Sequence, residues 1–313
     1  MSGKTMGTTW QINLINTYAN NKKLIKEINK QLYYDNKELS FWEKNSKILK
    51  FNNYYGTKPQ HISKNFAKIM LTALLIGKKT SYALDVTIGT LVNIWGFGPK
   101  KPPNKIPKLK TIKNALLFTG LKNIKLIKKN KKYYLKKNIK KITLDFSTLG
   151  EGFIADHLKE LLIKKGIEDF VISVGGAITT HSKNNFSNPK IIAIQKPTDK
   201  KINIHMIVKL QNHAISTSGT YRNYYYLKGK KIVHLLDPIT GYPTKTDLVS
   251  VSVITKSALE SDAWDTGLMI LGFEKAKQLA IKEKLAVCLI KKHGSKLFTW
   301  ISPKFYFFLK KDF

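Results

Sequence analysis

The spacing of apolar residues along the chain predicts a mixture of helices and short strands. Residues 6–14 alternate between apolar and polar side chains, which is typical of a strand. Residues 21–34 and 63–79 have apolar side chains at helical spacing and predict two helices. A continuous apolar run at residues 170–174 predicts a buried strand. Short strands are expected near Ile191, Ile204, Ile215, Ile232 and Val249.

The second half of the chain adds further helices. A helix over residues 151–165 should end at Gly166, because glycine readily adopts the left-handed backbone found at a helix end. Residues 258–282 predict a pair of helices, followed by strands near the end of the chain. Long helices mixed with many short strands favour an α+β fold, which we expect to form one domain over residues 1–313.

Composition places the chain among globular proteins. Apolar residues make up 42% of its 313 residues and charged residues 24%, so the chain can bury a core. No apolar run approaches the roughly 18 residues that a membrane span needs, and residues 1–8 do not resemble a secretory signal. The only cysteine, Cys288, lies in an apolar run and is predicted to be a buried thiol. A single cysteine excludes an internal disulfide and a cysteine-based zinc site, and it lies far from the start, where a lipid-anchor cysteine would stand.

The net charge of +35 raises the question of a nucleic-acid partner. Arg222 is the only arginine among 55 basic residues, although arginine is the residue that reads DNA bases best. Lysine instead occurs in nearly every polar stretch, together with many Asn and Ile, which are the residues that AT-rich codons favour. The lysine-rich stretch 99–140 predicts a surface loop over 99–113 and a hairpin over 124–137. We therefore expect no nucleic-acid partner.

Two clusters in the first half of the chain contain candidate functional residues. The first, Ala83-Leu84-Asp85 followed by the run 91–98, is interpreted as a strand and turn with core aromatics when taken alone. The second, residues 144–153, is a loop of small residues that leads into a helix, an arrangement that presents N–H groups to phosphate. Asp145 and Glu151 could instead accept hydrogen bonds from a base or ribose. A capped helix start with Ser147 and Glu151 as capping groups is equally supported.

A third cluster, residues 215–224, combines hydroxyl side chains with the single arginine. Arg222 suggests a site that needs a planar guanidinium, such as one for phosphate or carboxylate, with the loop 216–219 as a second source of donors. His234 follows, beside the turn 237–241. A lone histidine is usually structural, but strand ends and turns are where site residues gather.

The fourth cluster is residues 257–268. Ser257 and Glu260 match a capping box and predict where the helix begins. Asp262, Asp265 and Thr266 then lie on one face of that helix, at the border of its apolar stripe. Carboxylate and hydroxyl oxygens suit Mg²⁺ far better than zinc. A solvated face with lysine partners is the alternative, and spacing alone slightly favours it.

Taken together, these clusters resemble the ApbE family of FAD:protein FMN transferases, and the sequences of the motifs are most similar to those of enterobacterial members. The similarity covers nearly the whole chain and rests on the order of many motifs, each weak alone. The motifs are Met6-Gly-Thr-Thr-Trp, Ala83-Leu-Asp, Leu91-Val-Asn-Ile-Trp-Gly-Phe-Gly, Asp145-Phe-Ser-Thr-Leu-Gly-Glu-Gly, Val174-Gly-Gly, Ile194-Gln-Lys-Pro, Ser216-Thr-Ser-Gly-Thr-Tyr-Arg, His234-Leu-Leu-Asp-Pro-Ile-Thr-Gly and Asp262-Ala-Trp-Asp-Thr-Gly-Leu.

The resemblance implies a fold, a reaction and a set of site residues. The fold is α+β, with two interwoven α/β subdomains and the active site between them. The reaction cleaves FAD, releases AMP and attaches FMN through a phosphoester bond to a Thr or Ser hydroxyl of an acceptor protein. His234 would act as the base, and Mg²⁺ would be held by Thr148 (through its backbone carbonyl), Asp262, Asp265 and Thr266. The FAD-binding site would be lined by Met6, Trp42, Ala83, Leu84, Asp85, Asp145, Glu151 and Leu236.

The resemblance also implies partners and a location. The acceptors would be flavoprotein subunits of the sodium-pumping NADH:quinone reductase or of Rnf-type complexes. Family members are usually exported and lipid-anchored, so we expect the periplasmic side of the inner membrane, although this chain shows neither a signal peptide nor an anchoring cysteine. Two alternatives stay open. They are an FAD pyrophosphatase that gives FMN and AMP, and a flavin-binding protein without catalysis.

Overall fold

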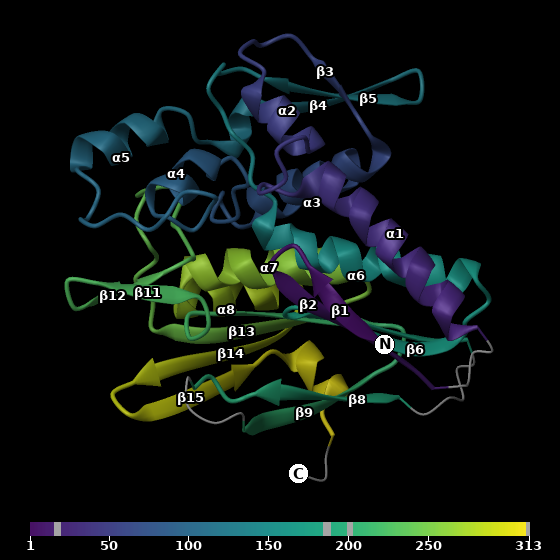
Figure 1. The fold of residues 1–313 in the computed structure, drawn as a ribbon. Helices are drawn as coiled ribbons and strands as arrows, with labels where there is room; N and C mark the ends of the chain where they lie inside the picture. Colours follow the sequence, from purple (N-terminus) through teal and green to yellow (C-terminus); the bar gives the residue numbers. More distant parts are fainter. Residues whose placement is uncertain (16–19, 184–188, 199–202, 311–313) are drawn as a thin grey trace. The chain divides into compact units, whose positions relative to one another are not determined.

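A computed structural model describes residues 1–15, 20–183, 189–198 and 203–310 (Figure 1). The chain folds into two compact units, each assembled from separate stretches of sequence. Unit 1 comprises Met1–Tyr34, Leu149–Arg222 and Thr246–Phe313, and unit 2 comprises Asp35–Thr148 and Asn223–Lys245. The expected α+β fold with interwoven parts is confirmed. The expected place of the active site stays a prediction.

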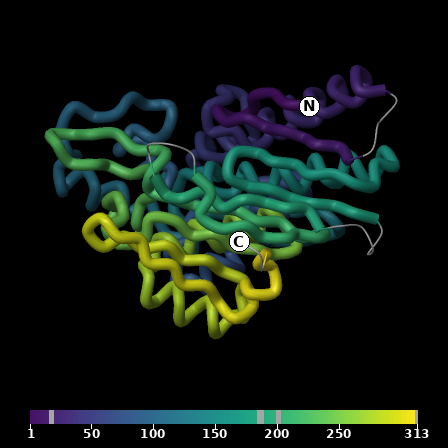
Figure 2. The backbone as a smooth tube through the Cα atoms, turned by 90° about the horizontal axis from the view of Figure 1, so that it is seen from below, coloured from purple at the N-terminus to yellow at the C-terminus, as the bar shows by residue number. Residues whose placement is uncertain are grey.

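Unit 1 is built on an eight-stranded sheet whose neighbouring strands are all antiparallel. Strands β1 and β15 form its edges, and the yellow hairpin in Figure 2 is β14–β15. In sheet order the strands are β1 (Ser2–Thr5), β2 (Thr8–Leu14), β6 (Asp169–Val174), β7 (Ala177–Ser182), β10 (Ala214–Gly219), β13 (Leu248–Thr255), β14 (Ala286–His293) and β15 (Lys296–Ile301).

The two faces of this sheet carry different layers. Helix α7 (Ala258–Leu271) packs on β10 and β13. Successive strand residues point to opposite faces. Ser216 in β10 bonds to a side chain of α7, so its neighbour Ile215 faces the other side. There Ile215 joins an apolar cluster with the hairpin of β8 (Lys190–Gln195) and β9 (Ile204–Leu210), and with the short helix η2 (Pro303–Phe308).

The other helices of unit 1 are α6 (Ser147–Lys164), whose first two residues belong to unit 2, and α8 (Phe273–Lys282), which contacts β14. Helix α1 (Asn21–Leu39) begins in unit 1 and its last residues belong to unit 2.

Unit 2 contains a small sheet and a helical cluster. The sheet order is β3 (Gln60–Ile62), β5 (Lys132–Lys137) and β4 (Ile124–Lys129), and α3 (Lys64–Lys79) packs on β5. The hairpin of β11 (Tyr224–Leu227) and β12 (Lys230–Val233) shares an apolar cluster with α4 (Gly89–Ile94) and α5 (Leu109–Leu116). The remaining elements are α2 (Lys47–Asn53) and the short helix η1 (Leu121–Asn123).

Most predicted elements are confirmed, including the helix from Ser63, the hairpin over 124–137, the helix pair over 258–282 and the stop at Gly166, whose φ is +74°. The strand predicted over 6–14 is confirmed as β2 (Thr8–Leu14), but Met6 and Gly7, with positive φ values of 44° and 77°, form the turn that joins it to β1.

Two predictions are wrong in the segment 91–113, where the structure has helices that the sequence pattern did not predict. The run 91–98 begins with the helix α4 and contains no strand, because its apolar residues pack at helical spacing around Trp95. The surface loop 99–113 ends in helix α5, which buries Ile112 and Ala115 in the same cluster. Short helices of this kind are stabilised by tertiary packing more than by propensity.

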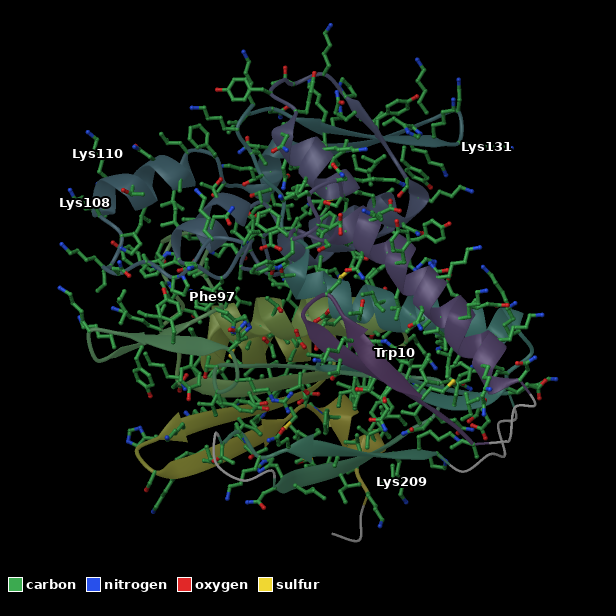
Figure 3. All side chains as sticks on the ribbon, in the orientation of Figure 1. Trp10, Phe97, Lys108, Lys110, Lys131 and Lys209 are labelled. Carbon is green, nitrogen blue, oxygen red and sulfur yellow. The ribbon has the colours of Figure 1, made fainter. Side chains whose placement is uncertain are left out.

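Most lysine side chains lie on the exterior, with the buried Lys137 as an exception. The labelled Lys108, Lys110, Lys131 and Lys209 extend outward from the ribbon in Figure 3. Cys288 is buried, as expected, and burial raises the pKa of its thiol to about 12. Among the described residues, no helix has both the length and the apolar character required to cross a membrane.

Candidate functional site

Three acidic side chains of unit 1 come together at the contact between α6 and α7. Asp262 and Asp265 are buried on α7, with 8% and 1% of their surface exposed, and Thr266 beside them is 5% exposed. Asp262 accepts hydrogen bonds from the backbone N–H of Gly152 at 2.8 Å and from the Ser216 hydroxyl at 3.3 Å. The predicted shared face is therefore confirmed, and it is buried, which excludes the solvated alternative.

The charge on this acidic cluster is poorly compensated. Burial raises the pKa values of Asp262 and Asp265 well above their usual range; the charge of Asp265 raises that of Asp262 further, and the charge of Glu151 raises both. Hydrogen bonding from Ser216 and Thr266 lowers the pKa of Asp265 in part, and the Thr266 hydroxyl donates to its Oδ1 at 3.2 Å. Its second oxygen, Oδ2, is buried without a hydrogen-bond partner. Buried carboxylates usually have a partner, so this oxygen is available to a ligand of positive charge.

Glu151 of α6 lies against the turn between β6 and β7, where Gly175 and Gly176 allow a close approach. Its carboxylate accepts the backbone N–H of Gly176 at 2.7 Å. A Cβ at Gly175, whose φ is +52°, would lie only 2.0 Å from a Glu151 oxygen. Burial raises the pKa of Glu151, whereas hydrogen bonds from Gly176 and Thr8 and the charge of Arg222 lower it. Glu151 is therefore not a capping group.

Helices α6 and α7 are held together by residues that the sequence did not single out. A Cβ at Gly152 would lie 2.3 Å from the Ala258 carbonyl oxygen, so only glycine allows this approach. One turn later, Asp156 caps α7 from outside that helix. Its carboxylate accepts the N–H groups of Ala258 and Leu259 at 2.9 and 3.1 Å and the Ser257 hydroxyl at 2.6 Å.

The sequence did contain a signal for this contact, a glycine inside a predicted helix with an acid four residues later on the same face. The predicted N-cap at Ser257 is confirmed by its bond from the Glu260 N–H at 3.4 Å. In a full capping box the Glu260 side chain would accept the Ser257 N–H, but here the Thr255 hydroxyl accepts it at 3.2 Å.

We expect Asp156→Ala to lower the stability of unit 1 by about 1–3 kcal/mol, because it leaves two buried N–H groups of α7 without acceptors. Thermal unfolding should show a lower midpoint than in the unaltered protein. Glu260→Gln on the exposed side of α7 is the matched control and should change stability by less than about 0.5 kcal/mol. Equal midpoints for both variants would show that Asp156 does not hold α7.

The prediction of a loop over 216–219 is wrong, because these residues belong to strand β10. All four pair with β13, and Ser216 also pairs with Ala177 of β7. Arg222, after this strand, donates a hydrogen bond to Gln195 and lies over the Tyr221 ring at 5.6 Å. Its proposed role toward phosphate stays a prediction.

In unit 2, Asp85 is the centre of a buried hydrogen-bond cluster. One carboxylate oxygen accepts the backbone N–H and the hydroxyl of Thr87 at 2.7 and 2.5 Å, and the other accepts the Leu121 N–H at 2.8 Å. Burial raises the pKa of Asp85, and these hydrogen bonds partly lower it. The carboxylate thus joins two loops, and a ligand at Ala83–Asp85 would meet mainly the backbone.

Asp145 is held next to this cluster. Its backbone N–H donates to the Val86 carbonyl at 2.8 Å, and its buried carboxylate accepts the Ser147 N–H at 2.8 Å together with the Ser147 hydroxyl. Burial raises its pKa. Asp145, and not the expected Ser147, therefore accepts the hydrogen bonds at the start of α6, where Thr148 is the second residue.

The segment just before Asp145, residues 142–144, is held by side chains from other parts of unit 2. The Asn52 side chain bonds both the N–H and the carbonyl of Leu144, at 2.7 and 2.8 Å. The buried Lys137 ammonium donates to the carbonyls of Phe51 and Ile142, each at 3.2 Å. Burial lowers the pKa of Lys137 to about 8. Asp145 is thus positioned by contacts from three parts of unit 2.

His234 follows β12 directly and is fixed by the base of the hairpin. Both its backbone N–H and its ring Nδ1 face the Asn223 carbonyl, at 3.2 and 3.0 Å. Because a carbonyl only accepts, Nδ1 carries the proton and Nε2 is left as the acceptor in the neutral ring. Burial lowers the pKa of His234, so the neutral form dominates at pH 7.

The remaining predicted residues differ in exposure. Trp42 is 60% exposed, which is unusual for so large an apolar side chain and suits stacking on a flat ligand. Leu236 is buried in the cluster with Leu91 and Trp95, so only its backbone is available. Met6 lies at the β1–β2 turn, with its sulfur near Gly150 of α6.

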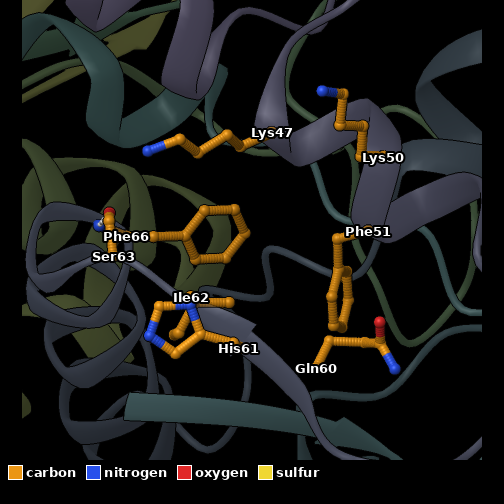
Figure 4. A pocket seen from close by; sticks show the side chains of 8 residues that line it. All are labelled: Lys47, Lys50, Phe51, Gln60, His61, Ile62, Ser63 and Phe66. Atoms are coloured by element: carbon orange, nitrogen blue, oxygen red, sulfur yellow. Dashed lines mark hydrogen bonds between the residues drawn. The ribbon is translucent and has the colours of Figure 1, made fainter. Parts of the chain in front are cut away.

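A separate cavity of about 160 Å³ in unit 2 contains none of the predicted site residues (Figure 4). Its apolar side chains, Phe51, Ile62 and Phe66, are core residues, and Lys47 at its rim is paired with Glu38 at 3.3 Å. We assign it no function.

The acidic cluster fits a divalent cation in its chemistry. Asp262, Asp265 and Thr266 supply hard oxygen donors, and the unpaired Oδ2 of Asp265 is available to a positive partner. Within the described ranges, no three acidic, histidine or cysteine side chains are arranged as a metal site by themselves. A cation here would therefore need further oxygen ligands, such as a backbone carbonyl or water.

Comparison with known proteins extends over nearly the full length. The family model described as "ApbE family" matches residues 6–289. The chain belongs to the ApbE family. A relative described as FAD:protein FMN transferase from Buchnera aphidicola subsp. Baizongia pistaciae is 57% identical, over 99% of this chain and 91% of the relative. The relative of that description from Escherichia coli K12 is 45% identical, over 100% of this chain and 89% of the relative.

Solved ApbE structures agree with this assignment. The structure titled as the flavin transferase ApbE from Vibrio cholerae superposes with a TM-score of 0.88 at 33% identity, covering 99% of this chain and 98% of that one. An apo flavinyl transferase ApbE from Pseudomonas stutzeri gives 0.86 at 26% identity, covering 99% and 96%. Every predicted site residue falls within the range that matches the ApbE family.

Proposed function

We propose that this chain is an FAD:protein FMN transferase. The observation that carries the proposal is a nearly full-length identity of 57% to a relative of that description, in a chain whose predicted metal-binding acids Asp262 and Asp265 are both buried. The substrates are FAD and a protein with a Thr or Ser hydroxyl. The products are AMP and a protein that carries FMN in a phosphoester bond.

The proposed reaction exchanges one phosphorus–oxygen bond for another. The acceptor hydroxyl oxygen attacks the FMN phosphorus, and the bond from that phosphorus to the bridging oxygen breaks. AMP leaves with the bridging oxygen. The acceptor proton passes to Nε2 of His234, whose orientation is supported by the Nδ1 contact to Asn223. Catalysis of phosphoryl transfer depends mainly on positioning and charge.

We propose that Asp262, Asp265 and Thr266 hold Mg²⁺, with the Thr148 carbonyl as a further ligand. A bound Mg²⁺ would supply positive charge to the pyrophosphate and the departing AMP. The chain's own contribution is to keep the acids fixed, through the Gly152 N–H and the Ser216 hydroxyl that bond Asp262. The buried Oδ2 of Asp265, which has no hydrogen-bond partner, supports this assignment.

The binding of FAD is proposed to use the residues of the family motifs. The exposed Trp42 ring is suited to stacking on a flavin or adenine ring, and the backbone of Ala83, Leu84, Asp85 and Leu236 is suited to hydrogen bonding. Asp145 and Glu151 would accept hydrogen bonds, and Met6 would contact FAD from the β1–β2 turn.

The acceptors we propose are flavoprotein subunits of the sodium-pumping NADH:quinone reductase or Rnf-type complexes, on the periplasmic side of the inner membrane. Both statements rest on the family resemblance.

The proposal is tested by incubating the protein with FAD, Mg²⁺ and a soluble fragment of such an acceptor. We expect flavin fluorescence on the acceptor that survives denaturing electrophoresis, and one AMP released per FMN attached. AMP and free FMN without labelled acceptor would indicate a pyrophosphatase. FAD binding without any AMP would indicate a flavin-binding protein without catalysis.

A further inference from the structure

Lys137, the last residue of β5, is the only buried lysine in the part of the chain that the structure describes, with 1% of its surface exposed. Its ammonium donates hydrogen bonds to three carbonyls, those of Phe51 at 3.2 Å, Asn52 at 3.4 Å and Ile142 at 3.2 Å. Burial lowers the pKa of Lys137 to about 8, so the ammonium form prevails at pH 7. An ammonium has three protons, and these three carbonyls use all of them.

The three carbonyls belong to two stretches of unit 2 that are far apart in the sequence. Phe51 and Asn52 lie in the last turn of α2, where carbonyls often lack a partner within the helix and where a positive charge is favourable. Ile142 begins the segment 142–145, which follows β5 and ends at Asp145. Lys137 therefore ties the end of α2 to the segment that carries Asp145.

Asn52 completes this connection. Its backbone carbonyl accepts the Lys137 ammonium, while its side-chain amide bonds both the N–H and the carbonyl of Leu144, at 2.7 and 2.8 Å. Asp145 is the next residue, and its N–H donates to the Val86 carbonyl at 2.8 Å. Direct hydrogen bonds thus run from the Lys137 ammonium to the residue before Asp145.

A charge in this core costs free energy that an apolar side chain would avoid. Among the described residues, burial is the one cause that shifts the pKa of Lys137, with no carboxylate near enough to support the ammonium. Buried charges without a counter-ion depend on hydrogen bonds for compensation. A methionine would fill similar space, but it could not bond α2 and the segment 142–145 together. The contribution of Lys137 is therefore position more than volume.

We propose that Lys137 and Asn52 are positioning residues for FAD, which hold Asp145 where its carboxylate accepts a hydrogen bond from that substrate. This inference rests on the proposed transferase function, in which Asp145 belongs to the FAD site. It adds two residues from outside the predicted site that act through Asp145.

The test compares three variants of the full chain. Lys137→Met removes the three donors and nearly keeps the length of the side chain. Asn52→Ala removes both bonds to Leu144, and because Asn52 is only half-buried this variant serves if Lys137→Met does not fold. Leu135→Ala is the matched control, since Leu135 is fully buried in the same strand and its truncation lowers stability without removing a hydrogen bond.

We expect Lys137→Met and Asn52→Ala each to weaken FAD binding about tenfold, because a small displacement of a binding group is costly. Calorimetry well below the midpoint of thermal unfolding measures this affinity. The KM for FAD should rise in parallel and the rate at saturating FAD should change little, since the lost contact binds FAD and takes no part in the bond exchange. Leu135→Ala should bind FAD as the unaltered protein does.

An Asp145→Ala background separates positioning from a general loss of stability. Because Lys137 acts through Asp145, adding Lys137→Met to Asp145→Ala should weaken FAD binding by less than about twofold further. Independent effects would instead combine, and the full tenfold loss would appear again.

Unchanged FAD affinity in either folded variant would overturn the positioning role. So would an equal loss in Leu135→Ala, or a tenfold loss that persists in the Asp145→Ala background. If the unaltered protein binds FAD but attaches no FMN to an acceptor, the proposed function fails, while these binding measurements still test Lys137 and Asn52.

Hydrogen exchange tests the same contacts if the unaltered protein binds no FAD. The N–H groups of Leu144 and Asp145 should exchange faster in Lys137→Met than in Leu135→Ala, because only the first variant releases the segment 142–145. Equal exchange rates in the two variants would overturn the proposal.

Discussion

His234→Ala should lower the rate of FMN transfer by about 10²–10⁴-fold, the usual contribution of a positioned acid–base group. FAD affinity should stay unchanged, because Nε2 would contact the acceptor hydroxyl. Single-turnover transfer and FAD binding, measured on the same variant, separate these two effects. His61→Ala is the matched control, since His61 lies in the same unit and its ring meets Tyr134 edge to face at 5.6 Å, much as His234 meets Phe97.

The pH profile gives a second measure of the same role. Only the neutral ring can accept a proton, so the rate should fall as acid protonates His234. Burial lowers its pKa, so the midpoint of this fall should lie below the ordinary value of about 6.5. The variant should lack this midpoint. A variant that binds FAD weakly yet transfers at the normal rate when saturated would show that His234 is structural.

Asp262→Ala and Asp265→Asn should each abolish the Mg²⁺-dependent part of turnover, a loss of roughly 10³-fold if the cation supplies several kcal/mol. The physical reason is that both acids are buried and Asp265 has an oxygen without a hydrogen-bond partner. Loss of a ligand removes the cation and leaves the pyrophosphate charge without compensation.

Thermal unfolding with and without Mg²⁺ checks this independently of activity. A cation at 100 times its dissociation constant should stabilise the unaltered protein by about 2.7 kcal/mol, and neither variant should show this gain. Glu260→Gln removes a negative charge from the exposed side of the same helix and should keep the full Mg²⁺ effect. Full activity in a folded Asp262→Ala protein would rule out this metal site.

Local sequence patterns were sufficient for most elements and for the start of α7. Apolar periodicity predicted α1 and α3, because these helices expose one face and bury the other. Ser257 predicted the N-cap, since capping involves residues only three positions apart. The order of the motifs also identified the ApbE family, which the comparisons confirmed.

The tertiary structure decided what the sequence left open. Spacing placed Asp262 and Asp265 on one face of a helix, but only packing against α6 and β10 shows that this face is buried. Asp156 caps α7 across about a hundred residues, and Asp85 is joined to Leu121. Such contacts have no local period, so no window of sequence can reveal them.

The same reason explains the elements that were predicted wrongly. Helices α4 and α5 are too short to be stable alone, and they form because β11–β12 completes their apolar cluster. Ser216 and its neighbours look like a phosphate loop from their small polar side chains, yet pairing with β13 makes them a strand. The sequence by itself determined the local elements and the residues that could react. Long-range packing decided which of those residues are buried and which partners they have, because desolvation and hydrogen-bond satisfaction depend on all the surrounding chain.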